Sequence, residues 1–233
     1  MYASTRYMPF GDSALLVEFG DAVNRETNRR VLALNNTLER ERIEGVEELV
    51  PTYRSLLVRF NPMKTSYEKI AFLIRDVEEK LLVSSTEVSG KRIVVPVVYG
   101  GKYGQDLKHV AAVHGLSEEQ VIRLHVEAEY RVYMIGFVAG FPYLGEVADE
   151  IATPRLETPR LRVSAGSVGI AEKQTGIYPC DAPGGWQIIG KTPMRLFDPL
   201  KQPPALLKAG DTVEFRRISK EEFMTLEKEL FQR

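Results

Sequence analysis

The segment SVGIAEKQTGIYPCDAPGGWQIIGK, residues 167–191, decides the fold class, because it consists of short apolar pieces separated by glycine and proline. Brief apolar runs bounded by turn residues are typical of β-strands. The same texture extends over residues 130–218. Closely spaced short strands of this kind predict a β-barrel or a β-sandwich.

The end of that segment also spells a phosphate-binding loop, because Gly185 is followed, after four residues, by Gly190, Lys191 and Thr192. A true P-loop needs a buried strand before it, a tight glycine-rich turn and a helix after it. Here a proline-containing turn precedes Gly185, the inner residues are bulky and β-prone, and Pro193 disfavours a helix. We therefore predict a strand here and no ATP binding through Gly185–Thr192.

The first part of the chain alternates between strand-like and helix-like patterns. Apolar residues recur with period two in the predicted strands and at helical spacing in the predicted helices. Asn24 is a candidate N-cap, and Thr65 with Glu68 forms a candidate capping box. The order strand–helix–strand–strand–helix–strand predicts a ferredoxin-like α/β domain, with elements at residues 13–20, 24–42, 46–60 (two strands), 65–81 and 91–100.

Residues 83–91 are small, polar and typical of turns, so they predict a domain boundary. We expect an N-terminal ferredoxin-like domain over residues 1–90 and a β-barrel domain with flanking helices over residues 91–233. Two of those helices are predicted at 105–113 and 118–128, the second with a capping box from Ser117 to Gln120, and a last helix follows Ser219. The predicted fold class is α+β.

Composition restricts the classes of partner. A net charge of −1 provides no basic footprint for nucleic acid or for a membrane surface. The single cysteine, Cys180, fits a reducing cytosol, and neither a signal peptide nor a long apolar run is present, so we expect a cytoplasmic protein. The three histidines, at 109, 114 and 125, lack the spacing of a metal site, so no metal is predicted.

Three longer segments carry a resemblance to one family: MIGFVAGFPYLG (134–145), TPRLETPRLRVSAGSVGIAEKQTGIYP (153–179) and APGGWQIIGKTP (182–193). Together they resemble the family of 5-oxoprolinase B subunits, which includes Kip-type inhibitors of sporulation histidine kinases. A related sequence, also described as allophanate hydrolase subunit 1-like, forms half of the carboxyltransferase domain of urea carboxylase. The resemblance implies an N-terminal α/β domain followed by a cyclophilin-like β-barrel.

The sequence departs from the usual spelling of that family at several positions. Ser164 stands where proline is usual, Glu172 where glycine is common, and Lys191 where arginine is frequent. The exchange at Lys191 alone creates the P-loop spelling. A carboxylate at position 172 could alter the ligand preference of a nearby site.

The polar residues of these segments are the candidate site. Arg160, chosen over Arg155 and Arg162 because it matches the family motif best, is expected to bind a substrate carboxylate. Gln174 could accept from an amide N–H, and Tyr178 could donate to a carbonyl oxygen. His125 is either a residue of a helix face or a proton-handling group. The predicted catalytic residues are His125 and Tyr178, and the predicted substrate-binding residues are Arg160, Gln174, Ser167, Gly184, Gly185 and Trp186.

Each of these residues also has a purely structural interpretation. Glycines serve tight turns, a tyrosine hydroxyl satisfies a buried carbonyl, and Trp186 packs in a core. The resemblance implies one component of an ATP-dependent 5-oxoprolinase that opens the lactam of 5-oxo-L-proline to L-glutamate with A and C subunits and is inactive alone. The alternative is an inhibitor that binds a histidine kinase and blocks its autophosphorylation. Half of a biotin-dependent carboxyltransferase is a weaker third possibility.

Overall fold

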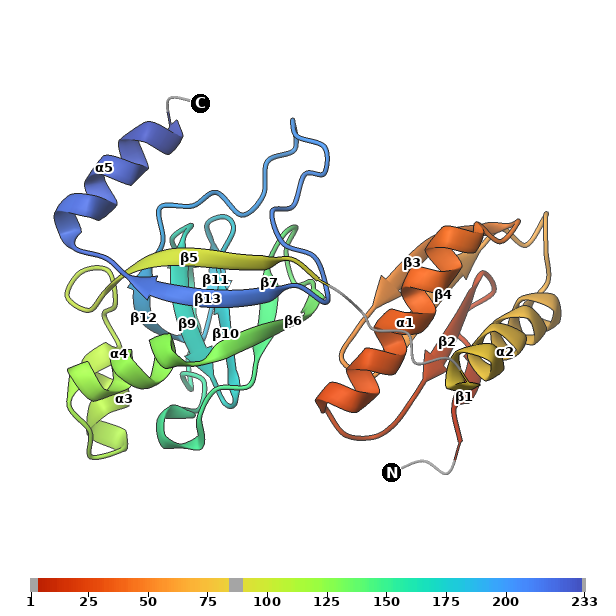
Figure 1. Cartoon of the computed structure of the whole chain (residues 1–233), viewed down its shortest axis with the longest axis horizontal. Coiled ribbons are helices and arrows are strands. Elements are labelled where there is room, and N and C mark those ends of the chain that lie inside the picture. Colours follow the sequence, from red (N-terminus) through yellow and green to blue (C-terminus); the bar gives the residue numbers. More distant parts are fainter. Residues whose placement is uncertain (1–3, 84–89, 232–233) are drawn as a thin grey trace. The chain divides into compact units, whose positions relative to one another are not determined.

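The computed structural model describes residues 4–83 and 90–231 of the chain. The chain forms two compact units, residues 1–89 and 90–233 (Figure 1). The predicted domain boundary at 83–91 falls almost wholly on residues 84–89, which lie outside the described residues.

The first unit is a four-stranded antiparallel sheet with two helices. The strand order is β1-β2-β4-β3, and the side chains of β2, β4 and both helices share one buried core. Asn24 caps the first helix by accepting a hydrogen bond from the Thr27 N–H at 2.8 Å, as the sequence predicts. The elements are β1 (Arg6–Pro9), β2 (Ala14–Glu18), α1 (Arg25–Glu41), β3 (Val46–Pro51), β4 (Ser55–Phe60) and α2 (Tyr67–Val83).

The strand predicted at residues 91–100 does not belong to this sheet, so that part of the sequence interpretation is wrong. It is β5 (Arg92–Tyr99) of the second unit, where Val95 and Val97 are fully buried in the barrel core. The edge of the first sheet beside β2 is formed instead by β1, which pairs antiparallel with β2. The order from β2 to α2 follows the prediction, while the ferredoxin-like assignment stays a prediction.

The second unit is built on a closed seven-stranded barrel, so the barrel alternative and the α+β class are confirmed. Going round the barrel, the order is β10-β7-β6-β13-β5-β12-β9. Figure 1 shows β5 (yellow) beside β13 (blue), and this pair is parallel although its strands are far apart in sequence. The remaining barrel strands are β6 (Glu129–Ile135), β7 (Pro142–Gly145), β9 (Ser167–Ala171), β10 (Gln174–Ile177), β12 (Gln187–Lys191) and β13 (Thr212–Arg217).

A separate two-stranded sheet, β8 (Arg160–Val163) with β11 (Ala182–Gly184), belongs to the same unit. Its helices are α3 (Leu107–Val113), α4 (Glu118–Glu127), the short η1 (Asp149–Ile151) and α5 (Lys220–Phe231). The predicted capping box opens α4, with Ser117 and Gln120 bonded to each other's backbone. No helix within 4–83 or 90–231 is long and apolar enough to cross a membrane.

Candidate functional site

One pocket collects several of the residues that the sequence marks. It has a volume of about 290 Å³ and is lined by residues from the β6–β7 loop, β7, the segment before β8, and the chain around β11. We call it the aromatic pocket, because its main side chains are Phe137, Phe141, Tyr143, Arg155, Tyr178 and Trp186. Its size is at the small end of the roughly 300–1,000 Å³ range of ligand sites.

The aromatic rings hold each other in place. Phe141 meets Tyr178 and Trp186 edge to face, with ring centroids 5.1 and 5.3 Å apart, and Tyr143 meets Trp186 at 5.9 Å. Aromatic pairs prefer this geometry, because the positive edge of one ring faces the negative face of the next. The pocket therefore has walls with fixed orientations that suit a small, flat, partly apolar ligand.

Phe137 combines exposure with an unusual backbone conformation. Its side chain is 60% exposed, and its φ is +64°. A bulky residue rarely adopts the left-handed region, and such strained positions concentrate at functional sites. Its ring contacts Phe141 at 5.7 Å, edge to face, so it continues the aromatic wall outward.

Tyr178 provides a polar group in this apolar setting. A backbone hydrogen bond from Trp186 reaches its hydroxyl, and burial raises the pKa of the Tyr178 hydroxyl. The phenol therefore keeps its proton near neutral pH and can donate it in a hydrogen bond. Gly184 makes room for this hydroxyl, because a Cβ at position 184 would lie 2.1 Å from the Tyr178 Oη.

Arg155 provides the positive charge of the aromatic pocket. Its guanidinium carbon lies 5.9 Å from the centroid of the Trp186 ring, and its side chain is exposed. Within the described part of the chain, no carboxylate forms an ion pair with it. A guanidinium held over an aromatic face with its donors unused is well suited to bind a carboxylate.

Arg160, the arginine that the sequence analysis preferred, is engaged in the protein itself. Its guanidinium donates to Asp106 Oδ1 at 2.6 Å and lies 3.4 Å from the Trp186 carbonyl oxygen. Asp106 also accepts from the Ile188 N–H at 2.7 Å and is nearly buried. Arg160 thus ties β8 to the start of α3 and to β12, and the expected pairing with a substrate carboxylate does not fit this arrangement.

Arg155 and Arg160 have similar local sequences, because both follow Thr-Pro in the stretch TPRLETPR, and only the resemblance to the family favoured Arg160. What separates them is Asp106, which lies 54 positions before Arg160 and captures it. A short sequence motif cannot predict an ion pair with a residue so far away in the sequence.

His125 is fully buried and lies outside the aromatic pocket. The Thr175 hydroxyl donates to the Gly169 carbonyl at 3.0 Å, so it can only accept from His125 Nε2, 2.9 Å away. Nδ1 therefore accepts from the Tyr99 hydroxyl, also at 2.9 Å, and the ring stacks on Phe215. Burial lowers the pKa of His125 from 6.5 to about 3. A neutral histidine with both nitrogens satisfied is typical of a core residue, so its surroundings do not support the predicted proton-handling role.

The remaining predicted residues divide between this pocket and other places. Gly184, Gly185 and Trp186 line the aromatic pocket together with Tyr178. Ser167 is buried on β9 beside Ser164, and Gln174 is half-buried on β10, so neither lies with the others. The site roles of all eight residues remain predictions, and the structure groups four of them.

Glu172 lies in the turn between β9 and β10 with a φ of +53°. Glycine adopts this backbone conformation without strain, which accounts physically for glycine at the same place in similar sequences. Glu172 does not line the aromatic pocket. The glutamate at position 172 therefore lies in a turn. It makes no contact with the aromatic pocket through which it could change ligand preference.

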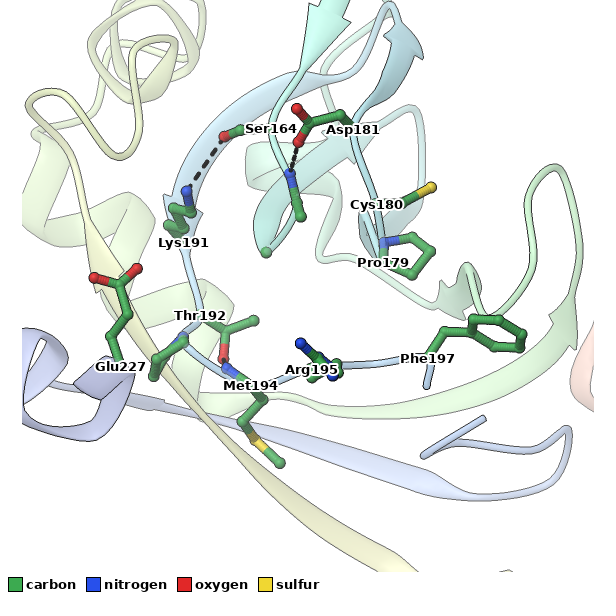
Figure 2. Close-up of a pocket in the computed structure, with 13 residues that line it drawn as sticks. Ser164, Pro179, Cys180, Asp181, Lys191, Thr192, Met194, Arg195, Phe197 and Glu227 are labelled. Carbon is green, nitrogen blue, oxygen red and sulfur yellow. Dashed lines mark hydrogen bonds between the residues drawn. The ribbon is translucent and has the colours of Figure 1, made fainter. Parts of the chain in front are cut away.

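A pocket of about 430 Å³ lies beside Lys191 (Figure 2). Figure 2 shows Lys191 and Arg195 with Asp181 and Glu227 around it, so its charges are mixed. Gln187–Lys191 is a barrel strand, as predicted, and not a glycine loop that leads into a helix. Among the described residues, no group of three or more histidine, cysteine, aspartate or glutamate side chains could hold a metal ion.

Comparison with known proteins gives a consistent result. The family described as "Carboxyltransferase domain, subdomain C and D" matches residues 5–207. The chain is 44% identical over 229 residues to the 5-oxoprolinase B subunit of Bacillus subtilis, and the match covers 94% of this chain and 95% of that protein.

Solved structures agree with this. The crystal structure of TTHA0988 is 37% identical with a TM-score of 0.79, and the match covers 88% of this chain but only 40% of that one. The Kluyveromyces lactis urea amidolyase shares the fold at 21% identity and a TM-score of 0.77, and the match covers 95% of this chain and 15% of the enzyme. The chain thus corresponds to one part of each of these longer proteins.

Proposed function

Because this chain belongs to the family of carboxyltransferase subdomains C and D, we propose that it is the B subunit of a multi-subunit, ATP-dependent 5-oxoprolinase. The complex, with A and C subunits, would open the lactam of 5-oxo-L-proline to L-glutamate. The observation that carries the proposal is the match, over nearly the full length of both chains, to a relative named as the B subunit of 5-oxoprolinase.

The aromatic pocket suits this substrate. 5-Oxoproline offers a flat five-membered ring, a carboxylate and a lactam carbonyl. We assign the ring to the aromatic walls and the carboxylate to Arg155, which can bind it through two parallel N–H donors. The Tyr178 hydroxyl then donates to the lactam oxygen of the bound substrate and orients it.

The reaction needs more than these groups provide. A five-membered lactam is stable and its opening is uphill, so transfer of a phosphoryl group from ATP to the amide oxygen would create a leaving group before water attacks. Arg155 and Tyr178 would bind the substrate and polarise its carbonyl group. The side chains that line the aromatic pocket include no histidine or carboxylate that could activate water. We therefore assign the base and the ATP chemistry to a composite site that partner subunits complete.

Reconstitution tests the proposal. Hydrolysis of 5-oxoproline is measured with ATP and purified A and C subunits, with and without this chain. We expect turnover only when all three are present and none from this chain alone. Full turnover by A and C without it would refute the proposal.

A histidine kinase assay separates the alternative function. If the chain blocks autophosphorylation of a kinase and adds nothing to lactam opening, the inhibitor interpretation is right and the enzyme-subunit proposal is wrong. Activity in the reconstitution assay alone supports the proposed role in the enzyme.

A further inference from the structure

We propose that a separate pocket on the barrel unit binds a ligand through a phosphate group, held by Lys102 and Lys191 with Arg162 beside them. This basic pocket has a volume of about 490 Å³, and its polar lining includes these three side chains with Gln105, Ser164 and Ser167. None of its lining residues lines the aromatic pocket. The inference therefore goes beyond the proposed function and can be tested without turnover.

The charges around the basic pocket are unbalanced. Its lining has three cationic side chains and, within the described residues, no carboxylate. Arg162 is paired with Asp181, whose Oδ2 lies 2.7 Å from the Arg162 Nε. Asp181 also interacts electrostatically with Lys191, so one carboxylate faces two of the three cations and a net positive charge of about two remains. A concave surface lined by one sign of charge concentrates ions of the opposite sign.

The backbone of Lys191 is fixed in strand β12, while its ammonium group can still bind a ligand. Its backbone pairs with Val98 on β5 and Ser167 on β9. Figure 2 shows its side chain pointing toward Ser164, and the Nζ lies 3.4 Å from the Ser164 hydroxyl. A contact of this length is a weak hydrogen bond. A phosphate oxygen would provide a shorter, charge-assisted one.

Lys102 approaches the same pocket from the loop between β5 and α3. Its ammonium lies 5.0 Å from the centroid of the Tyr103 ring, and no carboxylate within the described ranges pairs with it. An aromatic face orients a lysine without neutralising it. Loop and strand therefore place two ammonium groups at one pocket, and neither forms an ion pair within the described residues.

Hydroxyl groups complete the donor set. Ser164 Oγ and Ser167 Oγ are hydrogen-bonded to each other at 3.2 Å, which leaves one hydroxyl proton of the pair to donate to an anionic oxygen. A single terminal phosphate carries about −1.5 to −2 charges at pH 7, so the two positive charges that remain after Asp181 is counted match one phosphate group. Lys191 lies within Gly185–Thr192, so this proposal departs from the sequence-based prediction of no ATP binding there; the contact would come from its side chain and not from the backbone loop of a P-loop.

Calorimetric titration of the full chain at low salt tests the proposal with ATP, tripolyphosphate and adenosine. We expect ATP and tripolyphosphate to bind and adenosine not to. Lys102→Glu and Lys191→Glu should each weaken binding by about tenfold or more, while Lys191→Arg, which keeps the charge, should remain within about threefold of wild type. Lys208→Glu, an exposed lysine outside the basic pocket, is the matched control and should bind normally.

Thermal melting shows which variants stay folded. If Lys191→Glu does not fold, the binding measured with Lys102→Glu decides the test. Tighter binding of ATP than of tripolyphosphate identifies a nucleotide as the ligand, and equal binding identifies the phosphate group itself. The proposal is overturned if neither phosphate ligand binds the wild-type chain. It is also overturned if folded charge-reversal variants bind as well as wild type, or if Lys208→Glu weakens binding equally.

Discussion

At the scale of single residues, the absence of a side chain at Gly184 shapes the aromatic pocket. The Tyr178 hydroxyl occupies the space where a Cβ would be, at 2.1 Å, whereas at the next residue, Gly185, a Cβ would come no closer than 3.5 Å to any neighbour, the Leu156 carbonyl oxygen. These adjacent glycines therefore make different demands. A side chain at position 184 would collide with the Tyr178 hydroxyl, whereas a Cβ at position 185 would make only ordinary van der Waals contacts.

Gly184→Ala should destabilise the chain by about 1–3 kcal/mol, because the new methyl group forces Tyr178 or the β11 backbone to move. Gly185→Ala is the matched control and should stay within about 0.5 kcal/mol of wild type. Urea denaturation of both variants measures the difference. Equal stability of the two variants would contradict the described position of Tyr178.

His125 gives a prediction for pH dependence. Its pKa is about 3 in the folded chain against 6.5 for the free side chain, so the unfolded chain gains a proton at a higher pH than the folded chain. Stability from this residue is complete above about pH 6.5 and decreases by up to about 1.4 kcal/mol per pH unit as pH falls toward 3.

The free energy of unfolding, measured between pH 7 and pH 4, should therefore fall less steeply in His125→Gln than in wild type. His109→Gln, at an exposed position on α3, should keep the wild-type slope. Parallel slopes for wild type and His125→Gln would show that this histidine is not buried in its neutral form.

At the scale of elements, β8 pairs with β11, and one arginine links it to α3 and β12 as well. Arg160 at the start of β8 bridges to Asp106, which in turn accepts from the Ile188 N–H of β12. Two residues further along β8, Arg162 forms an exposed pair with Asp181. The same strand thus carries one nearly buried ion pair and one solvent-exposed pair.

Arg160→Ala should cost about 1–3 kcal/mol of stability, because it leaves the Asp106 carboxylate without its charged donor. Arg162→Ala should cost no more than about 1 kcal/mol, since exposed pairs contribute little. Thermal melts of the two variants make the comparison. An Arg160→Ala chain that melts like wild type and yet loses substrate binding would restore Arg160 as a substrate residue.

Helix caps and strands of this chain could be predicted where the signal lies within a few residues of the element. Asn24 and the capping box at Ser117 act through neighbours in sequence, and the structure contains both. The capping box predicted at Thr65 and Glu68 is wrong, because Ser66 Oγ accepts from the Lys69 N–H instead and Thr65 Oγ1 has no hydrogen-bond partner. The sheet to which β5 belongs could not be predicted. Its apolar valines indicate a strand, but its parallel partner β13 lies about half the chain away, at Thr212–Arg217.

The site was predictable only in part for the same reason. The segment with Gly184, Gly185 and Trp186 lies near Tyr178 in sequence, and these residues do line one pocket. For Arg160 and His125 the structure shows distant partners, Asp106 and Thr175, that no local motif reveals. Arg155 stands out only once its ring partner Trp186 and its lack of an ion pair within the described chain are visible.

At the scale of the whole molecule, the chain is two compact units with separate hydrophobic cores. Limited proteolysis of the full chain should cut near residue 90, because small polar turn residues join the two units. We expect two fragments that resist further digestion, with masses read by mass spectrometry. Resistance of that region, with cleavage elsewhere first, would contradict the division into two domains.

The central claim is that this chain contributes the substrate pocket of a 5-oxoprolinase, and Arg155 tests it most directly. In the reconstituted complex, Arg155→Ala should lower kcat/KM for 5-oxoproline by about 10²-fold, mainly through a higher KM, because the substrate carboxylate loses its partner. Arg123→Ala, an exposed arginine on α4, should match wild type. If folded Arg155→Ala and Arg123→Ala both show wild-type kcat/KM, the aromatic pocket is not the substrate site.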